Sequence, residues 1–264
     1  MSPLLLALLC SVHTAYAAEI SVVGSLVRQA EQDPGERTEG VILVRNNDDV
    51  PREILVHQSD YLFHADGRND FAPAGSLPRS NADWVSFNPA QVLVPPHQTV
   101  SVYYAIEAPD QDLSGSYWSL LLVEALPLPV EEQLPQVGRG VQIQTVIRYG
   151  VELISDLGGD VDGLLTFDSV ALRRQDGQTL LALDIANQGA IQASPRVWID
   201  LFDAEGAPAG RVTATQQSRI LPGCSTRFLL DLSELPRAAY TGLAIADAGG
   251  DLVFGADYQL DLRP

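Results

Sequence analysis

The sequence predicts an all-β protein made of two tandem immunoglobulin-like β-sandwich domains. Three segments of the first half each have a counterpart in the second half, in the same order. In both halves the first segment is a strand that ends in Asn, and the second is a turn with Pro between two strands. The third is an apolar strand that begins near an aromatic residue. The pairs are 40–46 with 180–187, 92–102 with 220–230, and 115–124 with 239–247. A repeated plan of this kind is more typical of binding or assembly modules than of enzymes.

Strand signals dominate both halves of the chain. Short apolar or alternating runs recur between Gly, Pro, Asn and Asp residues, and no stretch shows sustained helical periodicity with caps. The strands expected in the first domain are 19–24, 40–46, 52–58, 83–88, 99–107, 116–125 and 140–155. Those expected in the second domain are 164–173, 179–187, 195–203, 209–216, 225–232, 239–247 and 251–262. About seven strands per domain is the number that an immunoglobulin-like sandwich needs.

The boundary between the domains is expected at residues 156–163. This segment contains two adjacent glycines and three aspartates, which add little to a core and suit a hinge. We therefore expect a first immunoglobulin-like domain over residues 18–157 and a second one over residues 158–264.

Residues 1–17 have the pattern of a secretory signal peptide. An apolar stretch is followed by Ala15-Tyr-Ala17, a small-x-small cleavage site that predicts a mature chain starting at Ala18. The first three residues carry no Lys or Arg, so the position of the start codon is left open. No other run approaches the roughly 18 apolar residues of a membrane span. The pattern predicts export to the periplasm.

Charge excludes two classes of partner. The formal net charge is −18 and the isoelectric point is about 4.4. A surface this negative repels the phosphates of nucleic acid and of anionic lipid, so we expect neither partner. The excess of acidic residues is typical of a well-solvated surface.

The sequence offers no recognisable catalytic or metal-binding pattern. A metal site would have to join His57, His64, Asp60 and Asp66, whose spacing matches no zinc motif. Cys224 would be the single cysteine after removal of the signal, in a turn with no histidine nearby in sequence. We therefore expect a protein that is not an enzyme and that uses no cofactor and no metal.

Three stretches resemble the PapD-like superfamily of periplasmic pilus chaperones. Residues 85–102 resemble its Pro-rich segment between two strands, and residues 115–124 resemble its aromatic strand before a long loop. Residues 142–153 resemble the strand after that loop. The resemblance covers residues 20–155, and the second sandwich more loosely. It implies a two-domain periplasmic protein that binds exported subunits by adding a strand to them.

The resemblance makes residues 140–153 the candidate donor strand. An extended strand would place alternate side chains on one face. The apolar face would hold Val141, Ile143, Thr145, Ile147, Tyr149, Val151 and Leu153, and the opposite face Gln142, Gln144, Arg148 and Glu152. The alternative is an ordinary strand whose apolar face covers its own core.

The family also implies two basic residues that anchor the terminal carboxylate of the client. Arg28 and Arg148 are the nearest matches, although Val146 could equally occupy the position of the second basic residue. The candidate partner-binding residues are thus Arg28, Val141, Ile143, Thr145, Ile147, Arg148 and Tyr149.

The predicted function is that of an exported chaperone-like protein. It would bind another exported or pilus-type protein and assist its folding, assembly or surface display. One alternative is a structural or adhesive envelope component that binds a surface partner or cell-wall glycan, with Trp84 and Trp118 as stacking platforms. Another is an enzyme whose site is formed by residues distant in sequence. The client and the oligomeric state are left open.

Overall fold

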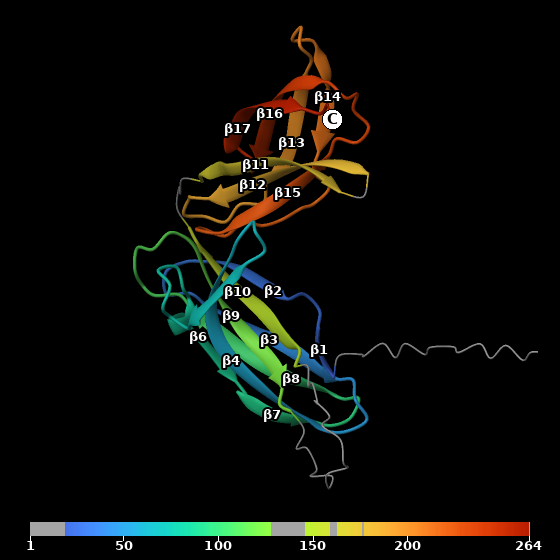
Figure 1. The fold of residues 1–264 in the computed structure, drawn as a ribbon. Helices are drawn as coiled ribbons and strands as arrows, with labels where there is room; N and C mark the ends of the chain where they lie inside the picture. Colours follow the sequence, from blue (N-terminus) through green and yellow to red (C-terminus); the bar gives the residue numbers. More distant parts are fainter. Residues whose placement is uncertain (1–18, 128–145, 159–162, 176, 264) are drawn as a thin grey trace, which may run out of the picture.

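The computed structural model describes residues 19–127, 146–158, 163–175 and 177–263. In these residues the chain forms β-strands and connecting loops, with a single short 3-10 helix, η1, at Ala82–Trp84. Figure 1 shows two sandwiches stacked end to end, with the chain crossing once from the first to the second after β10. None of the described helices is long and apolar enough to cross a membrane.

The first domain is a sandwich of two sheets. One sheet contains, in spatial order, β1 (Ile20–Val23), β3 (Arg37–Asn46), β8 (Thr99–Glu107) and β6 (Val85–Asn88). The other contains β2 (Val27–Gln32), β10 (Arg148–Leu157), β9 (Gly115–Ala125), β4 (Arg52–Phe63) and β5 (Asn69–Pro73), with β7 (Gln91–Val94) also paired to β4. We call this second sheet the junction sheet. Its strands pair antiparallel except for β2 and β10, which run parallel.

The second domain repeats the two-sheet plan. A three-stranded sheet contains β11 (Leu165–Gln175), β12 (Gln178–Asn187) and β15 (Ser225–Asp231). A four-stranded sheet contains β14 (Pro208–Thr213), β13 (Arg196–Phe202), β16 (Ala239–Asp247) and β17 (Val253–Asp261). Its core is formed by alternate apolar residues of the two facing sheets, among them Leu181, Leu183, Ile199 and Phe228.

The junction sheet is covered on both faces. Its inner face contributes Leu121, Val123 and Leu153 to the first-domain core. Its outer face contributes Trp118 and Ile154 to a buried cluster that continues into the core of the second domain. Because both faces are buried, the middle of β9, residues 120–123, is a continuous apolar run instead of an alternating one.

Close backbone contacts also join the domains. The Ser116 amide donates to the carbonyl oxygen of Ala190 at 2.9 Å. Gly115, with φ of +90°, precedes this contact, and a Cβ atom built on it would lie 2.2 Å from the same oxygen. The junction thus requires glycine at this position for its conformation and for its lack of a side chain.

The predicted fold class is confirmed, with corrections to individual elements. The prediction missed β2, β5 and β7, which are short strands with few buried apolar residues and so carry a weak period-two signal. The strand predicted at 140–155 begins at Arg148 in the described chain and continues to Leu157. Residues 140–145 and the predicted signal peptide lie outside the described residues. β10 ends at Leu157, two residues into the segment expected as the boundary, and β11 begins at Leu165, after it.

Candidate functional site

β10 extends beyond its neighbour on one side of the junction sheet. It pairs with β9 over its whole length, from Arg148 to Leu157. It pairs with β2 only from Glu152 onward, because β2 begins at Val27. Within the described chain, the first four residues of β10 therefore have a neighbouring strand on one side only. We call Arg148–Val151 the open edge.

The direction of one hydrogen bond defines which backbone groups face outward. The Glu152 amide donates to the carbonyl oxygen of Leu26 at 2.8 Å, on the side of β2. Backbone groups alternate along a strand with a period of two, so Arg148 and Gly150 direct their N–H and C=O groups to the same side. The open edge thus presents two residues whose backbone groups could pair with an added strand.

The side chains next to the open edge combine apolar and charged groups. Val146 and Ile147, just before β10, have 46% and 45% of their surface exposed. The Arg148 side chain points to the outer face of the sheet, where its Nε donates to Glu124 Oε2 at 2.7 Å. Tyr149 points inward, packs against the first-domain core and donates its hydroxyl to the carbonyl oxygen of Ile20 at 3.0 Å.

The second half of the predicted donor strand is an ordinary core strand. Val151 and Leu153 are fully buried in the first-domain core, as the alternative interpretation expected. The other predicted donor residues, Val141, Ile143 and Thr145, lie outside the described residues. Of the apolar donor face, the structure therefore leaves Ile147 exposed, directly before the open edge.

The two predicted anchor residues are not brought together. Arg28 lies on β2 opposite Leu153, whose side chain points into the first-domain core. Arg148 lies on the same strand as Leu153, but on the outer face and five residues earlier. The Arg28 guanidinium donates to the carbonyl oxygens of Ser25 and, at 3.3 Å, Val27. Arg28 and Arg148 thus face opposite sides of the junction sheet and form no common anion site.

A half-buried acid connects the open edge to the second domain. Glu152 follows the open edge directly, and its carboxylate contacts the Tyr61 hydroxyl of β4 and the Arg219 guanidinium of the second domain. Burial raises the pKa of Glu152 to about 7 and lowers the pKa of Arg219. The charge of each residue acts against the pKa shift of the other, because an opposite charge nearby favours the ionised form. No sequence signal joins these three residues, because they are far apart along the chain.

A second polar network lies at the other end of β10. Asp156 accepts hydrogen bonds from Ser116 Oγ at 2.5 Å, from Gln192 Nε2 at 2.6 Å and from Gln29 Nε2 at 2.8 Å. Gln192 belongs to the second domain, and the others to three strands of the first. Glu152 and Asp156 lie four residues apart on one strand, so two acidic side chains of β10 hold the domain junction.

The residues considered as a metal site in the sequence do not lie together, and each has contacts of its own. Buried Asp60 accepts hydrogen bonds from the amides of Ser76 and Leu77, each at 2.9 Å. His64 Nε2 lies 3.0 Å from Asp70 Oδ2, and His57 Nδ1 lies 3.8 Å from Glu124 Oε1. No group of three potential metal ligands occurs among the residues that the structure describes.

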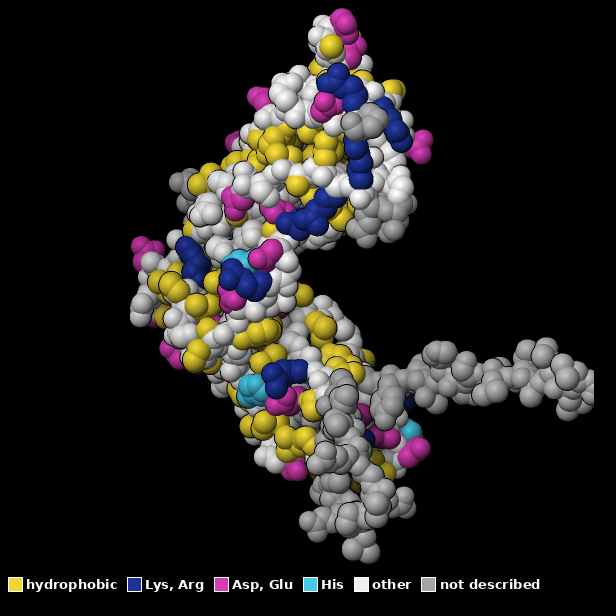
Figure 2. Space-filling view, viewed as in Figure 1, with side chains coloured by type: hydrophobic (Ala, Val, Ile, Leu, Met, Phe, Trp, Pro, Cys, Tyr) yellow, Lys and Arg dark blue, Asp and Glu magenta, His cyan; other side chains and the backbone are white. Residues whose placement is uncertain are grey.

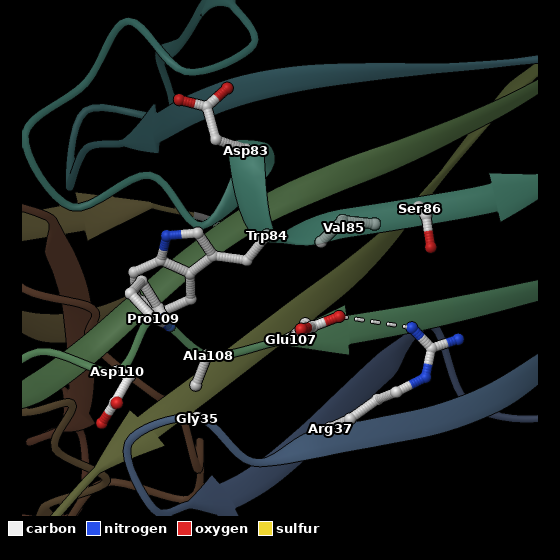
Figure 3. A pocket seen from close by; sticks show the side chains of 10 residues that line it. All are labelled: Gly35, Arg37, Asp83, Trp84, Val85, Ser86, Glu107, Ala108, Pro109 and Asp110. Carbon is white, nitrogen blue, oxygen red and sulfur yellow. Dashed lines mark ion pairs between the residues drawn. The ribbon is translucent and has the colours of Figure 1, made fainter.

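The two tryptophans considered as stacking platforms have different environments. Trp118 is buried, and its indole N–H donates to the carbonyl oxygen of Tyr61 at 3.0 Å, so it is a core residue. Trp84 is half-buried and lines a pocket at one end of the first sandwich. Figure 3 shows its indole beside Pro109, with the carboxylates of Asp83 and Asp110 directed away from it on opposite sides.

A hollow separates the two sandwiches on one side of the molecule. Figure 2 shows this hollow to the right of the junction, with arginine side chains along the wall formed by the second domain. The opposite wall, formed by the first domain, carries hydrophobic side chains together with His, Arg and acidic groups. Such a surface could receive a segment that is apolar in part and negatively charged in part.

The fold and junction define a two-domain protein of tandem immunoglobulin-like sandwiches. No family model matches this sequence, and no curated protein matches it. Solved structures with a similar fold include the class 5 fimbriae chaperone CfaA, with a TM-score of 0.46 and 11% identity over 91% of this chain and 98% of that chain. The Salmonella enterica complex of the SafA pilin with the SafB chaperone has a TM-score of 0.42 and 12% identity, over 93% of this chain and 98% of that chain.

The E. coli chaperone DraB gives a TM-score of 0.40 and 15% identity over 92% of this chain and all of that chain. Pilus chaperones, which the sequence resembles, are thus among the solved structures that this chain resembles. The likeness is distant at these values.

Proposed function

We propose that this protein is an exported, chaperone-like binding protein that captures an extended segment of another exported or pilus-type protein. The observation that carries the proposal is the open edge, where β10 projects past β2. The client segment pairs with the outward backbone groups of Arg148 and Gly150. The client is thereby assisted in folding, assembly or surface display in the periplasm.

The edge has the properties that strand addition requires. Its backbone groups are unpaired within the described chain, while its opposite side is held by the full ladder to β9. The added strand therefore meets a preformed template, and little ordering entropy opposes binding on the side of this protein. Ile147 supplies an exposed apolar side chain beside the edge. Main-chain pairing gives affinity, and the neighbouring side chains give selectivity.

The proposal is tested by a substitution that removes one edge N–H. Arg148→Pro deletes the outward N–H at the first residue of a strand, a position where proline is tolerated. Arg148→Ala is the matched control, because it removes the same side chain and its ion pair with Glu124 but keeps the N–H. Each tagged mature variant, residues 18–264, is used to capture partners from the native envelope fraction.

We expect the wild-type chain and Arg148→Ala to retain a common protein and Arg148→Pro to lose it. Far-ultraviolet circular dichroism and thermal melting establish that both variants are folded. Retention of the same protein by folded Arg148→Pro would place binding away from the open edge and contradict the proposal. Failure of the wild-type chain to capture or protect any envelope protein would contradict the chaperone-like function as a whole.

A further inference from the structure

The last strand of the second domain, β17, has a neighbouring strand on one side only. It pairs with β16 over its whole length, from Val253 to Asp261, and it is the last strand of its sheet. No strand of the described chain pairs with its other side. We call this side of Val253–Asp261 the β17 edge. It belongs to the second domain and is separate from the open edge of β10.

Two hydrogen bonds at the ends of the β16–β17 ladder define which backbone groups point outward. The Leu262 amide donates to the carbonyl oxygen of Ala238 at 3.0 Å. The Ala248 amide donates to the carbonyl oxygen of Leu252 at 2.9 Å. Even-numbered residues of β17 therefore face β16, because backbone groups alternate along a strand. The outward N–H and C=O groups are those of Val253, Gly255, Asp257, Gln259 and Asp261.

The β17 edge lacks the features by which proteins usually block strand addition. Its sequence contains no proline and no basic residue, and its register with β16 has no bulge. The edge strands β11 and β14 each have a break in register, and β14 also begins with Pro208. The remaining edge strands of the described chain are no longer than the 7 residues of β15. At 9 residues, β17 thus has the longest regular edge in the described part of the chain.

The first domain shows that this fold accepts a further strand at the corresponding position. β10 follows the strand at 115–125 and β17 follows its counterpart at 239–247, so β17 corresponds to β10 in the repeat. In the first domain, β2 runs parallel to β10 over Val27–Gln32. In the second domain, β11 pairs with β12, and no described strand takes the place of β2. The second sandwich therefore lacks, within the described residues, the strand that covers this edge in the first.

Apolar side chains beside the β17 edge are incompletely covered. Phe254 and Tyr258 point from β17 toward the core and are half-buried, whereas Ala244 on the adjacent strand β16 is fully buried. Val170, on the inner face of β11, is 36% exposed. The rings of Phe167 on β11 and Tyr258 have centroids 6.5 Å apart, so these half-covered side chains lie together. An added strand would place alternate side chains beside Phe254 and Tyr258 and remove more of their apolar surface from water.

We propose that the β17 edge binds an extended segment of a protein partner as an additional strand of the four-stranded sheet. The segment carries apolar residues at alternate positions, which cover Phe254 and Tyr258, and basic residues between them. Basic residues suit the outer face, where Asp257 stands at the middle of the edge on a chain of net charge −18. This site is independent of the open edge and of the function proposed from it.

A second copy of this chain fits the β17 edge less well than such a segment does. Antiparallel pairing of two β17 strands along their whole length would be centred on Asp257. The two Asp257 carboxylates would then lie directly opposite each other on one face, which destabilises a strand pair.

Hydrogen exchange at single amides of the mature chain tests the proposal. The probe is the acetylated and amidated peptide Lys-Val-Lys-Val-Lys-Val-Lys-Val-Lys. At saturation we expect it to slow exchange at the outward amides of Gly255, Asp257 and Gln259 by at least about tenfold. The inward amides of Ala256 and Tyr258 already pair with β16 and should change less. Each signal reports on its own amide, so a failure of the open edge to bind would not affect this result.

Two further peptides test the chemistry of the segment. A peptide of the same composition in which all lysines precede all valines lacks the alternation and should leave the outward amides unprotected. A peptide that alternates Glu with Val should bind at least about tenfold more weakly than the Lys-Val peptide. Equal protection by all three peptides, or none by the Lys-Val peptide, would overturn the proposal. Protection that appears without peptide and grows with protein concentration would also overturn it and would assign the edge to a second copy.

A pair of variants tests the role of the outward backbone groups. Gln259→Pro removes one outward N–H, which an edge strand tolerates, and Gln259→Ala removes the same side chain but keeps the N–H. We expect Gln259→Pro to bind the Lys-Val peptide about tenfold more weakly, as read from the Gly255 amide, and Gln259→Ala to bind it as the wild type does. Circular dichroism establishes that both are folded. Equal affinities of the two folded variants would contradict strand addition, and the wild-type exchange experiment decides the proposal if Gln259→Pro does not fold.

Discussion

The carboxylate of Glu152 and the guanidinium of Arg219 form a half-buried ion pair across the domain junction. Glu152 stands on the strand that also provides the open edge, and Arg219 lies in the loop before β15. Burial of both charges is costly, and the pair offsets that cost only while both partners are present. The junction therefore depends on this polar pair as well as on the apolar cluster that the two domains share.

Stability should fall as the pH rises through the range in which Glu152 loses its proton. The raised pKa means that the folded state binds this proton more tightly than the unfolded state does. The free energy of unfolding then decreases between pH 4.5 and about 7, the ordinary and folded pKa values, by no more than about 3 kcal/mol. Urea unfolding across this range measures the decrease, and Glu152→Gln should remove it. A wild-type stability that rises over this window would show that Arg219 outweighs burial.

Arg219→Met should destabilise the chain more at pH 8 than at pH 5. The substitution replaces the cation by an apolar side chain and leaves half-buried Glu152 without its partner, which costs up to about 3–5 kcal/mol when the acid is ionised. At pH 5 the acid can take up a proton, and the loss becomes smaller. Arg196→Met, at an exposed arginine, is the matched control. Equal losses for Arg219→Met at both pH values would contradict the coupling to Glu152.

Gly115→Ala should destabilise the junction by about 2–4 kcal/mol. The new Cβ would meet the Ala190 carbonyl oxygen at 2.2 Å, in addition to backbone strain at a φ of +90°. Gly24→Ala separates the two effects, because Gly24 has a φ of +94° and nothing within 4 Å of the added atom. Thermal melting should show a clearly larger loss for Gly115→Ala. Equal losses would mean that strain alone is responsible.

Asp60→Ala should loosen the loop after β5. Asp60 accepts the amides of Ser76 and Leu77 and the Ser80 hydroxyl, at 2.9, 2.9 and 2.6 Å. Its removal leaves these donors without their acceptor and should cost about 2–3 kcal/mol. Limited proteolysis should then cut within residues 74–81, whereas Asp66→Ala in an exposed turn should leave the digestion pattern unchanged. An uncut loop in Asp60→Ala would contradict this role.

Cys224 should react with thiol reagents only when the protein unfolds. The side chain is fully buried, and burial raises the pKa of the thiol to about 11. Little thiolate is therefore present near neutral pH, and a reagent such as Ellman's cannot reach it. Labelling kinetics in increasing urea should follow the unfolding transition. Rapid labelling of the native chain at pH 8 would contradict the described burial.

Much of the fold could be predicted because the strongest signals belong to buried strands. The Asn residues that end the two equivalent strands have the same structural role, since each side-chain amide donates to a backbone carbonyl of the following Pro turn. Asn46 donates to the carbonyl oxygen of Val94 at 3.0 Å, and Asn187 donates to that of Ile220 at 2.9 Å. This shared role explains the repeat seen in the sequence. Short strands such as β2 and β5 carried no comparable signal, because one side of each is exposed or faces the junction.

The candidate site was less predictable, because pairing register decides it. The alternation of residues 140–153 correctly placed Val151 and Leu153 on one face, but could not show that this face is filled by the chain's own core. The family resemblance predicted that Arg28 and Arg148 together anchor a carboxylate. The parallel register of β2 with β10 places the two residues on opposite faces of the sheet. Glu152, Arg219 and the pocket around Trp84 depend on contacts between distant segments, which periodicity does not encode.

The apolar cluster that runs from the outer face of the junction sheet into the second domain has a thermodynamic consequence. A chain cut at the boundary would leave Trp118 and Ile154 in water, so each half would be less stable alone than in the whole chain. Heating should produce a single calorimetric transition in place of two. The hollow between the sandwiches then has a defined width, set by a shared interior, and does not open and close through a freely jointed link.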